Sequence, residues 1–196
     1  MKSIKSSKLK SIYKGEDKMI ENSAAAEKAA IMNVARSMCA AARTAPKTKG
    51  TDHIKTCIIT GEDKDTLADE MERLSEVLNY GFFIRDASCI RSSEVVVMVG
   101  TTFDTRKLQE GCVYCHFKNC TDCTDKNGVC VYDPLDLGIA LGSAVSIAAD
   151  ARIDNRVMFS AGKAALSLGF MDHDVKIAMA IPLSASGKSP FFDRKR

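Results

Sequence analysis

The sequence predicts an α+β domain built from layers of helices and strands. Short runs rich in β-branched residues, at 54–60, 94–99 and 175–181, are separated by longer segments of helical periodicity. The second run is almost unbroken, as expected of a strand covered on both faces. The chain has 196 residues, of which 45% are hydrophobic and 27% are charged, so it can bury one ordinary core. This composition excludes collagen-like, low-complexity and wholly disordered chains.

Helices are expected where apolar residues recur every three or four positions. Residues 16–43 contain neither glycine nor proline and predict one long helix. Residues 62–78 place leucines and a methionine on one face. Asp133, followed by a proline, is expected to begin another helix, because aspartate is a good N-cap and proline fits the first turn. A last helix is expected at residues 157–168.

The formal net charge of +3 belongs to the beginning of the chain. Residues 1–18 hold six lysines and two acidic residues, whereas the whole chain has 28 Lys and Arg against 25 Asp and Glu. The remainder is therefore nearly neutral, and no nucleic-acid partner is expected. Residues 1–15 are interpreted as a flexible basic extension, and residues 16–196 as a single α+β domain.

Neither export nor membrane insertion is predicted. Apolar residues near the start stand singly among lysines and serines, unlike those of a secretory signal. The longest small and apolar stretch, residues 138–149, is too short and too rich in glycine and serine to cross a bilayer. We therefore expect a soluble, cytoplasmic protein without a membrane partner, in a compartment that keeps thiols reduced.

Cysteine is the most unusual part of the composition, since five of the eight cysteines fall in a loop of about residues 108–132. Three closely spaced thiols in this loop are followed by two candidates for a fourth ligand. The three are Cys112, Cys115 and Cys120, and the candidates are Cys123 and Cys130. Thiolate sets of this kind suit iron–sulfur clusters or zinc.

The spacing favours a [4Fe–4S] cluster. Structural zinc sites usually pair two cysteine knuckles well apart in sequence, whereas here three ligands follow one another and the fourth arrives later. Val113, Tyr114, Phe117 and Val129 are expected to form an apolar wall around the cluster. His116 is interpreted as a nearby or surface group. Zinc is the first alternative, and a metal-free dithiol or disulfide is the second.

The remaining cysteines, Cys39, Cys57 and Cys89, lie in apolar surroundings and are expected to be buried, unreactive thiols.

Small residues recur at helical spacing after the loop, and they leave one side of the predicted helix nearly flat. They are Gly138, Gly142, Ser146 and Ala149. We expect this side to pack against another helix, within the chain or across a homodimer interface. A flat cofactor ring is the alternative.

Several short motifs along the chain form a specific combination. They are residues 41–47, 85–87, 136–144, 154–158, 181–184, 187–188 and 190–194, together with Cys112, Cys115, Cys120 and Cys130. With these motifs, residues 31–194 resemble an uncharacterised family of ferredoxin-domain-containing proteins from anaerobic bacteria and archaea. The resemblance implies a cluster held by those four cysteines, with Cys123 as a spare thiol. In that family a glycine usually follows the second cysteine, where this chain has His116.

The order of elements is also similar to that of the flavin-dependent nitroreductases, with a long first helix, an Ala-Pro turn and a late helix rich in glycine and alanine. This similarity implies nitroreductase-like layers with an inserted cysteine-rich iron–sulfur loop. It also implies FMN contacts by Arg43, Thr44, Lys47 and Lys188, since such side chains bind phosphate oxygens. The alternative is that the cations near residue 43 are a solvated helix end, favoured by the macrodipole.

Together these features predict an iron–sulfur redox protein and candidate flavin-dependent oxidoreductase. The cluster would exchange single electrons with a bound FMN, and the acceptor would be a redox partner protein or a small organic molecule. The competing hypothesis is a non-enzymatic binding or sensing protein whose loop holds a structural zinc ion or cluster. The sequence contains no Ser-His-Asp set, paired carboxylates or P-loop, which argues against hydrolysis and phosphoryl transfer.

Overall fold

A four-stranded antiparallel sheet with the strand order β1-β2-β4-β3 forms the centre of the computed structural model, which describes residues 20–192. The strands are β1 (Ile54–Ile59), β2 (Val95–Thr101), β3 (Asp154–Asn155) and β4 (Ile177–Ser184). The register pairs Thr101 with both Ile54 and Ile177, so these three residues mark one end of the sheet. The basic extension predicted at residues 1–15 lies outside the described residues.

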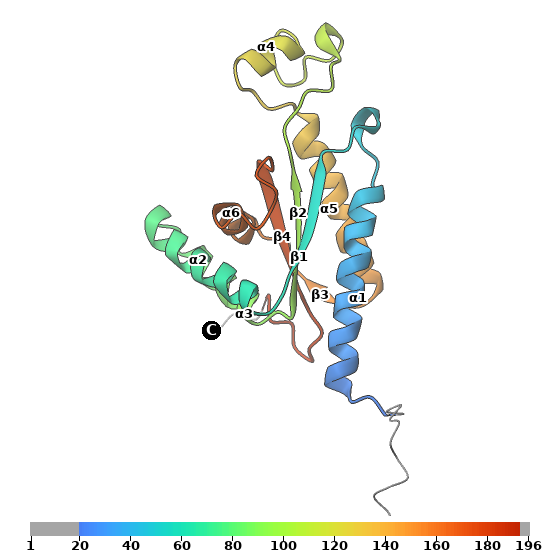
Figure 1. The fold of residues 1–196 in the computed structure, drawn as a ribbon, viewed down its shortest axis with the longest axis vertical. Coiled ribbons are helices and arrows are strands. Elements are labelled where there is room, and N and C mark those ends of the chain that lie inside the picture. Colours follow the sequence, from blue (N-terminus) through green and yellow to red (C-terminus); the bar gives the residue numbers. More distant parts are fainter. Residues whose placement is uncertain (1–19, 193–196) are drawn as a thin grey trace, which may run out of the picture.

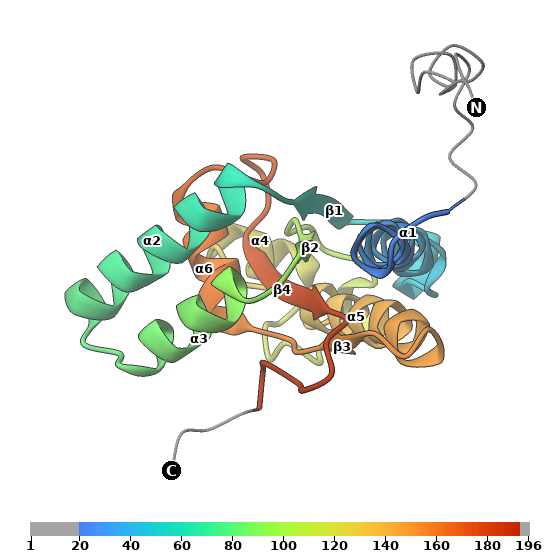
Figure 2. The same cartoon turned by 90° about the horizontal axis from the view of Figure 1, so that it is seen from below.

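Helices cover both faces of the sheet (Figures 1 and 2). On one face lie α1 (Ser23–Thr44) and α5 (Tyr132–Asp150), which pack against each other. On the other face lie α2 (Glu62–Leu78), α3 (Phe82–Arg91) and α6 (Phe159–Ser167). The predicted α+β class is therefore confirmed, with a purely antiparallel sheet between two helical layers.

Strand β2 supplies side chains to both cores. Val96 and Met98 pack with α2, α3 and α6, whereas Val97 and Val99 pack with α1 and α5. This alternation follows from the two-residue period of a strand. All residues of β2 are buried, as predicted from its β-branched composition.

Gly162 allows α6 to lie close to β4. A Cβ atom at this position would lie 1.9 Å from the carbonyl oxygen of Ala178, well inside van der Waals contact. Any larger residue would push the helix away from the sheet.

Several boundaries differ from the predicted ones. Helix α1 begins at Ser23, because the side chain of Asn22 accepts a hydrogen bond from the backbone N–H of Ala25 at 2.9 Å and caps the helix. Helix α3 was not predicted. The role predicted for Asp133 as an N-cap is wrong, since the N-cap of α5 is Val131 and Asp133 lies inside the first turn.

The flat stripe on α5 faces away from the helix partner. The packed side of α5 includes Leu137, Ala140 and Ala144, while Gly138 and Gly142 are exposed with open space where a Cβ would be. The expectation that the stripe packs against a helix within the chain is therefore wrong. Its use in a homodimer stays a prediction.

Candidate iron–sulfur site

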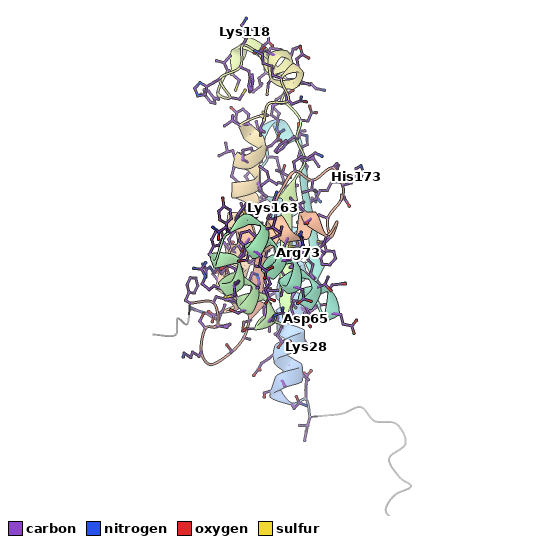
Figure 3. The ribbon with its side chains drawn as sticks, turned by 90° about the vertical axis from the view of Figure 1, so that its left-hand side faces the viewer. Lys28, Asp65, Arg73, Lys118, Lys163 and His173 are labelled. Carbon is purple, nitrogen blue, oxygen red and sulfur yellow. The ribbon has the colours of Figure 1, made fainter. Side chains whose placement is uncertain are left out.

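The cysteine-rich loop projects from the end of the sheet at which β2 ends and α5 begins (Figure 1). Figure 3 shows Lys118 of this loop at the opposite end of the molecule from Lys28 of α1. All five cysteines of the loop line one hollow: Cys112, Cys115, Cys120, Cys123 and Cys130. The fold thus brings together the four predicted ligands and the fifth thiol.

A short helix, α4 (Cys120–Asp125), positions two of these thiols. It begins after Asn119, whose side chain accepts a hydrogen bond from the backbone N–H of Asp122 at 2.9 Å. Residues three apart lie on the same side of a helix, so Cys120 and Cys123 both reach the hollow. This helix was not predicted from the cysteine spacing.

The backbone around the first two cysteines adopts unfavourable conformations. Val113 and His116, each directly after a cysteine, have φ values of 49° and 64°. Residues with a Cβ rarely occupy this left-handed region, and a β-branched residue such as valine is especially disfavoured there. The conformation at His116 explains why a glycine would suit that position. Backbone strain of this kind is concentrated at ligand-binding sites.

Cys123 is the most deeply buried of the five thiols, at 1% exposure. Burial, followed by the neighbouring thiols of Cys115, Cys130 and Cys120, raises the pKa of Cys123 to about 11. The thiols are therefore close enough to oppose one another's ionisation. The positive charge of metal ions bound to the thiolates would relieve this repulsion.

Gly128 makes room for this buried thiol. A Cβ atom at position 128 would lie 3.0 Å from Cys123 Sγ and 2.4 Å from the ring of Phe117. The glycine therefore lets the chain close tightly between α4 and Cys130.

The wall of the hollow differs from the predicted one. Leu108, Val131 and Tyr132 line it, and the hydroxyl of Tyr132 lies 3.9 Å from Cys112 Sγ. Of the predicted wall residues, only Val113 lines the hollow, and Tyr114 is 68% exposed. The predicted wall was therefore largely wrong.

The thiols share the hollow without meeting at one point. Among residues 20–192, no group of three or more His, Cys, Asp or Glu side chains is placed to hold a single metal ion. A single zinc ion would require several thiolate sulfurs to lie about 2.3 Å from one point, the position of the ion.

A buried ion network lies beside this hollow. Arg106, which also lines the hollow, donates hydrogen bonds from Nη1 to Asp133 Oδ1 at 2.8 Å and from Nη2 to Asp136 Oδ2 at 2.9 Å. All three side chains are at most 2% exposed. Burial alone would lower the pKa of Arg106, but the two carboxylates more than reverse this and raise it. Arg106 is therefore a permanent cation next to the thiols.

The network also fastens the loop to the rest of the domain. His53, just before β1, places Nδ1 2.8 Å from Asp133 Oδ1. Thr48 donates to Asp136 from its hydroxyl at 2.9 Å and also from its backbone N–H. Segments before β1, after β2 and at the start of α5 thus meet at this network.

One atom of the network lacks a partner. Within the described residues, Arg106 Nε is one of the buried side-chain polar atoms that have no hydrogen-bond partner. A buried N–H without an acceptor is costly and rare in folded proteins. An anionic, sulfur-rich group in the adjoining hollow would supply an acceptor, so the residues present fit an iron–sulfur cluster.

The predicted flavin contacts lie at two ends of the sheet. Arg43, Thr44 and Lys47 precede β1 at the end marked by Ile54, whereas Lys188 follows β4 at the opposite end. A single chain therefore does not bring these four residues together.

The side chain of Lys47 binds backbone carbonyls at the end of α1. Its Nζ donates to the backbone carbonyls of Ala42 at 2.8 Å and Ala45 at 2.9 Å, and its side chain is 5% exposed. Burial lowers the pKa of Lys47, and Asp52 acts in the opposite direction. Lys47 therefore lies at the helix end, as the alternative interpretation proposed, but it is buried rather than solvated.

Other residues of the motifs form hydrogen bonds that join α3, α6 and the segment around Phe191. Asp86 is buried and accepts hydrogen bonds from Ser160 Oγ at 2.6 Å and from Arg85. Arg156 donates to the carbonyl of Phe191 at 3.1 Å. These motif residues therefore have a structural role in joining α3, α6 and the C-terminal segment.

Sequence reasoning did not identify Arg106 or His53. Arg106 is the only arginine between β2 and the first cysteine of the loop. Its position next to the cysteines was the one feature of the sequence that could have indicated a role in the site.

Within residues 20–192, no helix is both long and apolar enough to span a membrane.

Known proteins of similar fold include nitroreductases and a related flavoprotein. The nitroreductase CinD from Lactococcus lactis, in complex with chloramphenicol, aligns with a TM-score of 0.55 and 12% identity over 83% of this chain and 84% of that chain. A Desulfovibrio desulfuricans protein assigned as a nitroreductase, in complex with FMN, aligns with a TM-score of 0.53 and 15% identity. The alignment covers 84% of this chain and 79% of that chain. A BluB-like flavoprotein from Clostridium difficile aligns with a TM-score of 0.51 and 17% identity, over 84% of this chain and 85% of that chain. These similarities show a nitroreductase-like fold.

Sequence comparison gives a closer relationship. An uncharacterized protein of Archaeoglobus fulgidus is 42% identical over 165 residues, covering 80% of this chain and 88% of that protein. The family described as "Uncharacterized protein containing a ferredoxin domain (DUF2148)" matches residues 126–194, which include Cys130, α5 and the C-terminal segment. The chain belongs to this DUF2148 family of ferredoxin-domain-containing proteins.

Proposed function

We propose that this protein is an iron–sulfur redox protein whose loop holds a [4Fe–4S] cluster. The observation that supports the proposal best is the set of five thiols around one hollow, next to a buried cation with an unpaired N–H. The ferredoxin domain in the family description supports it as well. The proposed ligands are Cys112, Cys115, Cys120 and Cys130. A bound cluster would supply reversible one-electron transfer.

The surrounding residues would set the conditions for that transfer. Leu108, Val131 and Tyr132 limit the access of water to the hollow. Arg106 offsets the negative charge of the thiolates, while Asp133 and Asp136 keep the guanidinium in place. The cluster would therefore lie in a partly dry site, beside a guanidinium that two carboxylates hold in place.

Coupling to FMN is the finer part of the proposal. The similar structure from Desulfovibrio desulfuricans contains FMN, which makes a flavin a reasonable second electron carrier on this fold. Because Arg43 and Lys188 lie at opposite ends of the sheet, a flavin that contacts both would lie between two copies of the chain in a homodimer. A redox partner protein or a small organic acceptor would then receive the electrons.

The test is the composition of the full-length protein purified without oxygen. We expect about four irons and four sulfides per chain, with broad visible absorbance that reduction bleaches. A Cys115→Ser variant should lose the iron, whereas Cys39→Ser, a change remote from the loop, should keep it. Bound flavin would support the FMN coupling. Zinc in place of iron, even after anaerobic reconstitution, would overturn the redox proposal in favour of a structural loop in a binding or sensing protein.

A further inference from the structure

Arg106 is held in a single orientation. Besides its bonds to Asp133 and Asp136, it donates from Nη1 to the backbone carbonyl of Asp104 at 3.0 Å. The same Nη1 lies 2.9 Å from His53 Nδ1. A guanidinium is planar, so partners on both terminal nitrogens also fix the direction of its Nε–H bond.

These contacts leave Nε as the unsatisfied donor of the group. The residue is 3% exposed, so bulk water does not readily solvate this N–H. Arg106 and the five cysteines line the same hollow. Sulfur becomes a much better hydrogen-bond acceptor when it carries negative charge, as in a thiolate or a cluster sulfide.

We infer that Arg106 tunes the reduction potential of the proposed cluster by donating a hydrogen bond from Nε to a cluster sulfur and by placing a positive charge beside it. This inference rests on the proposed function and goes beyond it, since it assigns the control of the potential to a residue that is not a ligand. Hydrogen bonds to sulfur and nearby positive charge both favour the reduced, more negative cluster. Arg106 should therefore raise the potential.

The carboxylates allow the two effects to be separated. Asp136→Asn removes one negative charge but keeps Arg106, so the potential should become more positive while the Nε–H bond remains. In the double variant Arg106→Met/Asp136→Asn, one charge of each sign is removed, the side chain at position 106 keeps a similar length without an N–H donor, and the net charge of the network is unchanged. The double variant therefore tests the hydrogen bond with little change in net charge.

The experiment measures two properties of the anaerobically loaded, full-length protein. Redox titration followed by electron paramagnetic resonance gives the potential, and resonance Raman spectra in H2O and D2O report hydrogen bonds to sulfur through shifts of the Fe–S bands. Wild type and Asp136→Asn should show the D2O shift. The double variant should lose part of that shift, and its potential should be more negative than that of wild type, which has the same net charge in the network.

Arg106→Lys provides a second comparison, because it keeps the charge but lacks the guanidinium Nε–H. It too should lose part of the D2O shift. Loaded, folded variants with the wild-type shift and potential would overturn the inference and leave the proposed function intact. A wild-type protein that binds no cluster would overturn both. Because Arg106→Lys and the double variant each keep the balance of buried charge, failure of one to fold leaves the other as the test.

Discussion

Ser160 Oγ donates a 2.6 Å hydrogen bond to Asp86 Oδ2, joining two residues that are 74 positions apart in the sequence. Both residues are buried, and Arg85 occupies the other carboxylate oxygen. This contact joins α6 to α3 on one face of the sheet.

Ser160→Ala should therefore destabilise the fold. The substitution leaves Asp86 Oδ2 buried without its partner, which should cost about 1–3 kcal/mol of the free energy of unfolding. Urea denaturation would measure it. The matched control is Ser146→Ala, since Ser146 is exposed on α5 and should change stability by less than about 0.5 kcal/mol. Equal decreases in the free energy of unfolding of both variants would show that the buried hydrogen bond does not stabilise the fold more than an exposed serine does.

The fourth ligand of the proposed cluster can be identified by comparing two serine variants. We expect Cys130→Ser to lose most of the iron and Cys123→Ser to retain it, because the chain's resemblance to its family assigns the ligand role to Cys130. Both thiols are buried and both line the hollow, so the two variants disturb similar surroundings. Iron and sulfide analysis after anaerobic reconstitution gives the answer. The reverse pattern would make Cys123 the ligand and Cys130 the spare thiol.

His116→Gly should stabilise the loop. His116 has φ at 64°, a conformation that costs a residue with a Cβ about 1–2 kcal/mol, and the greater flexibility of glycine offsets part of that cost. The net gain should be up to about 1 kcal/mol, measured as a higher melting temperature of the metal-free protein. Lys118→Gly is the control in the same loop, since Lys118 is not among the residues with positive φ. A loss of stability in His116→Gly would argue for a specific role of the imidazole.

The ion pair between Arg43 and Asp52 should make stability depend on pH. Burial tends to raise the pKa of Asp52, but its hydrogen bond from Arg43 and the neighbouring charges hold that pKa below its ordinary value of 3.8. A carboxyl with a depressed pKa stabilises the fold above its unfolded-state pKa, and this contribution is lost as the pH falls through the folded-state pKa. Arg43→Gln should therefore be less stable than wild type near neutral pH.

The difference between Arg43→Gln and wild type should shrink below about pH 4. Thermal melts across pH would follow it. Arg36→Gln is the control, because exposed Arg36 bonds the neutral side chain of Asn33. A pH-independent deficit in Arg43→Gln would mean that packing, rather than the ion pair, is responsible.

Cys57 should react slowly with alkylating reagents in the folded protein. Burial, followed by the neighbouring Cys39 and Asp172, raises the pKa of Cys57 from 9.0 to about 11. Two pKa units reduce the reactive thiolate about 100-fold at a given pH below both values. Iodoacetamide labelling read by mass spectrometry, compared between native and urea-unfolded protein, should show this protection. Equal rates in the two states would contradict it.

The sequence predicted the layered core well, because burial imposes a regular period. Residues 62–78 form a helix with the predicted bounds. The run predicted at 94–99 corresponds to β2 (Val95–Thr101), which is buried along its whole length, whereas Glu94 precedes the strand and is exposed. The exposed stripe at Gly138 and Gly142 shows the limit of this reasoning, since spacing alone does not tell which side of a helix faces a neighbour.

The candidate site was predictable only in part. Cysteine spacing identified the loop, because metal ligands must be close together, and the five thiols do share one hollow. The ion network depends on contacts between residues 27 and 30 positions apart, which leave no local pattern. Asp133 illustrates the difficulty, since the same residue is a good N-cap in sequence and a partner of Arg106 in the fold.

None of the buried residues that form the two hydrophobic cores of the described chain comes from residues 102–136. The loop is instead attached through polar contacts of Arg106 with the first turns of α5. Folding of the domain and loading of the loop can therefore occur as separate events. Loss of the proposed cluster should therefore leave both hydrophobic cores of the domain intact.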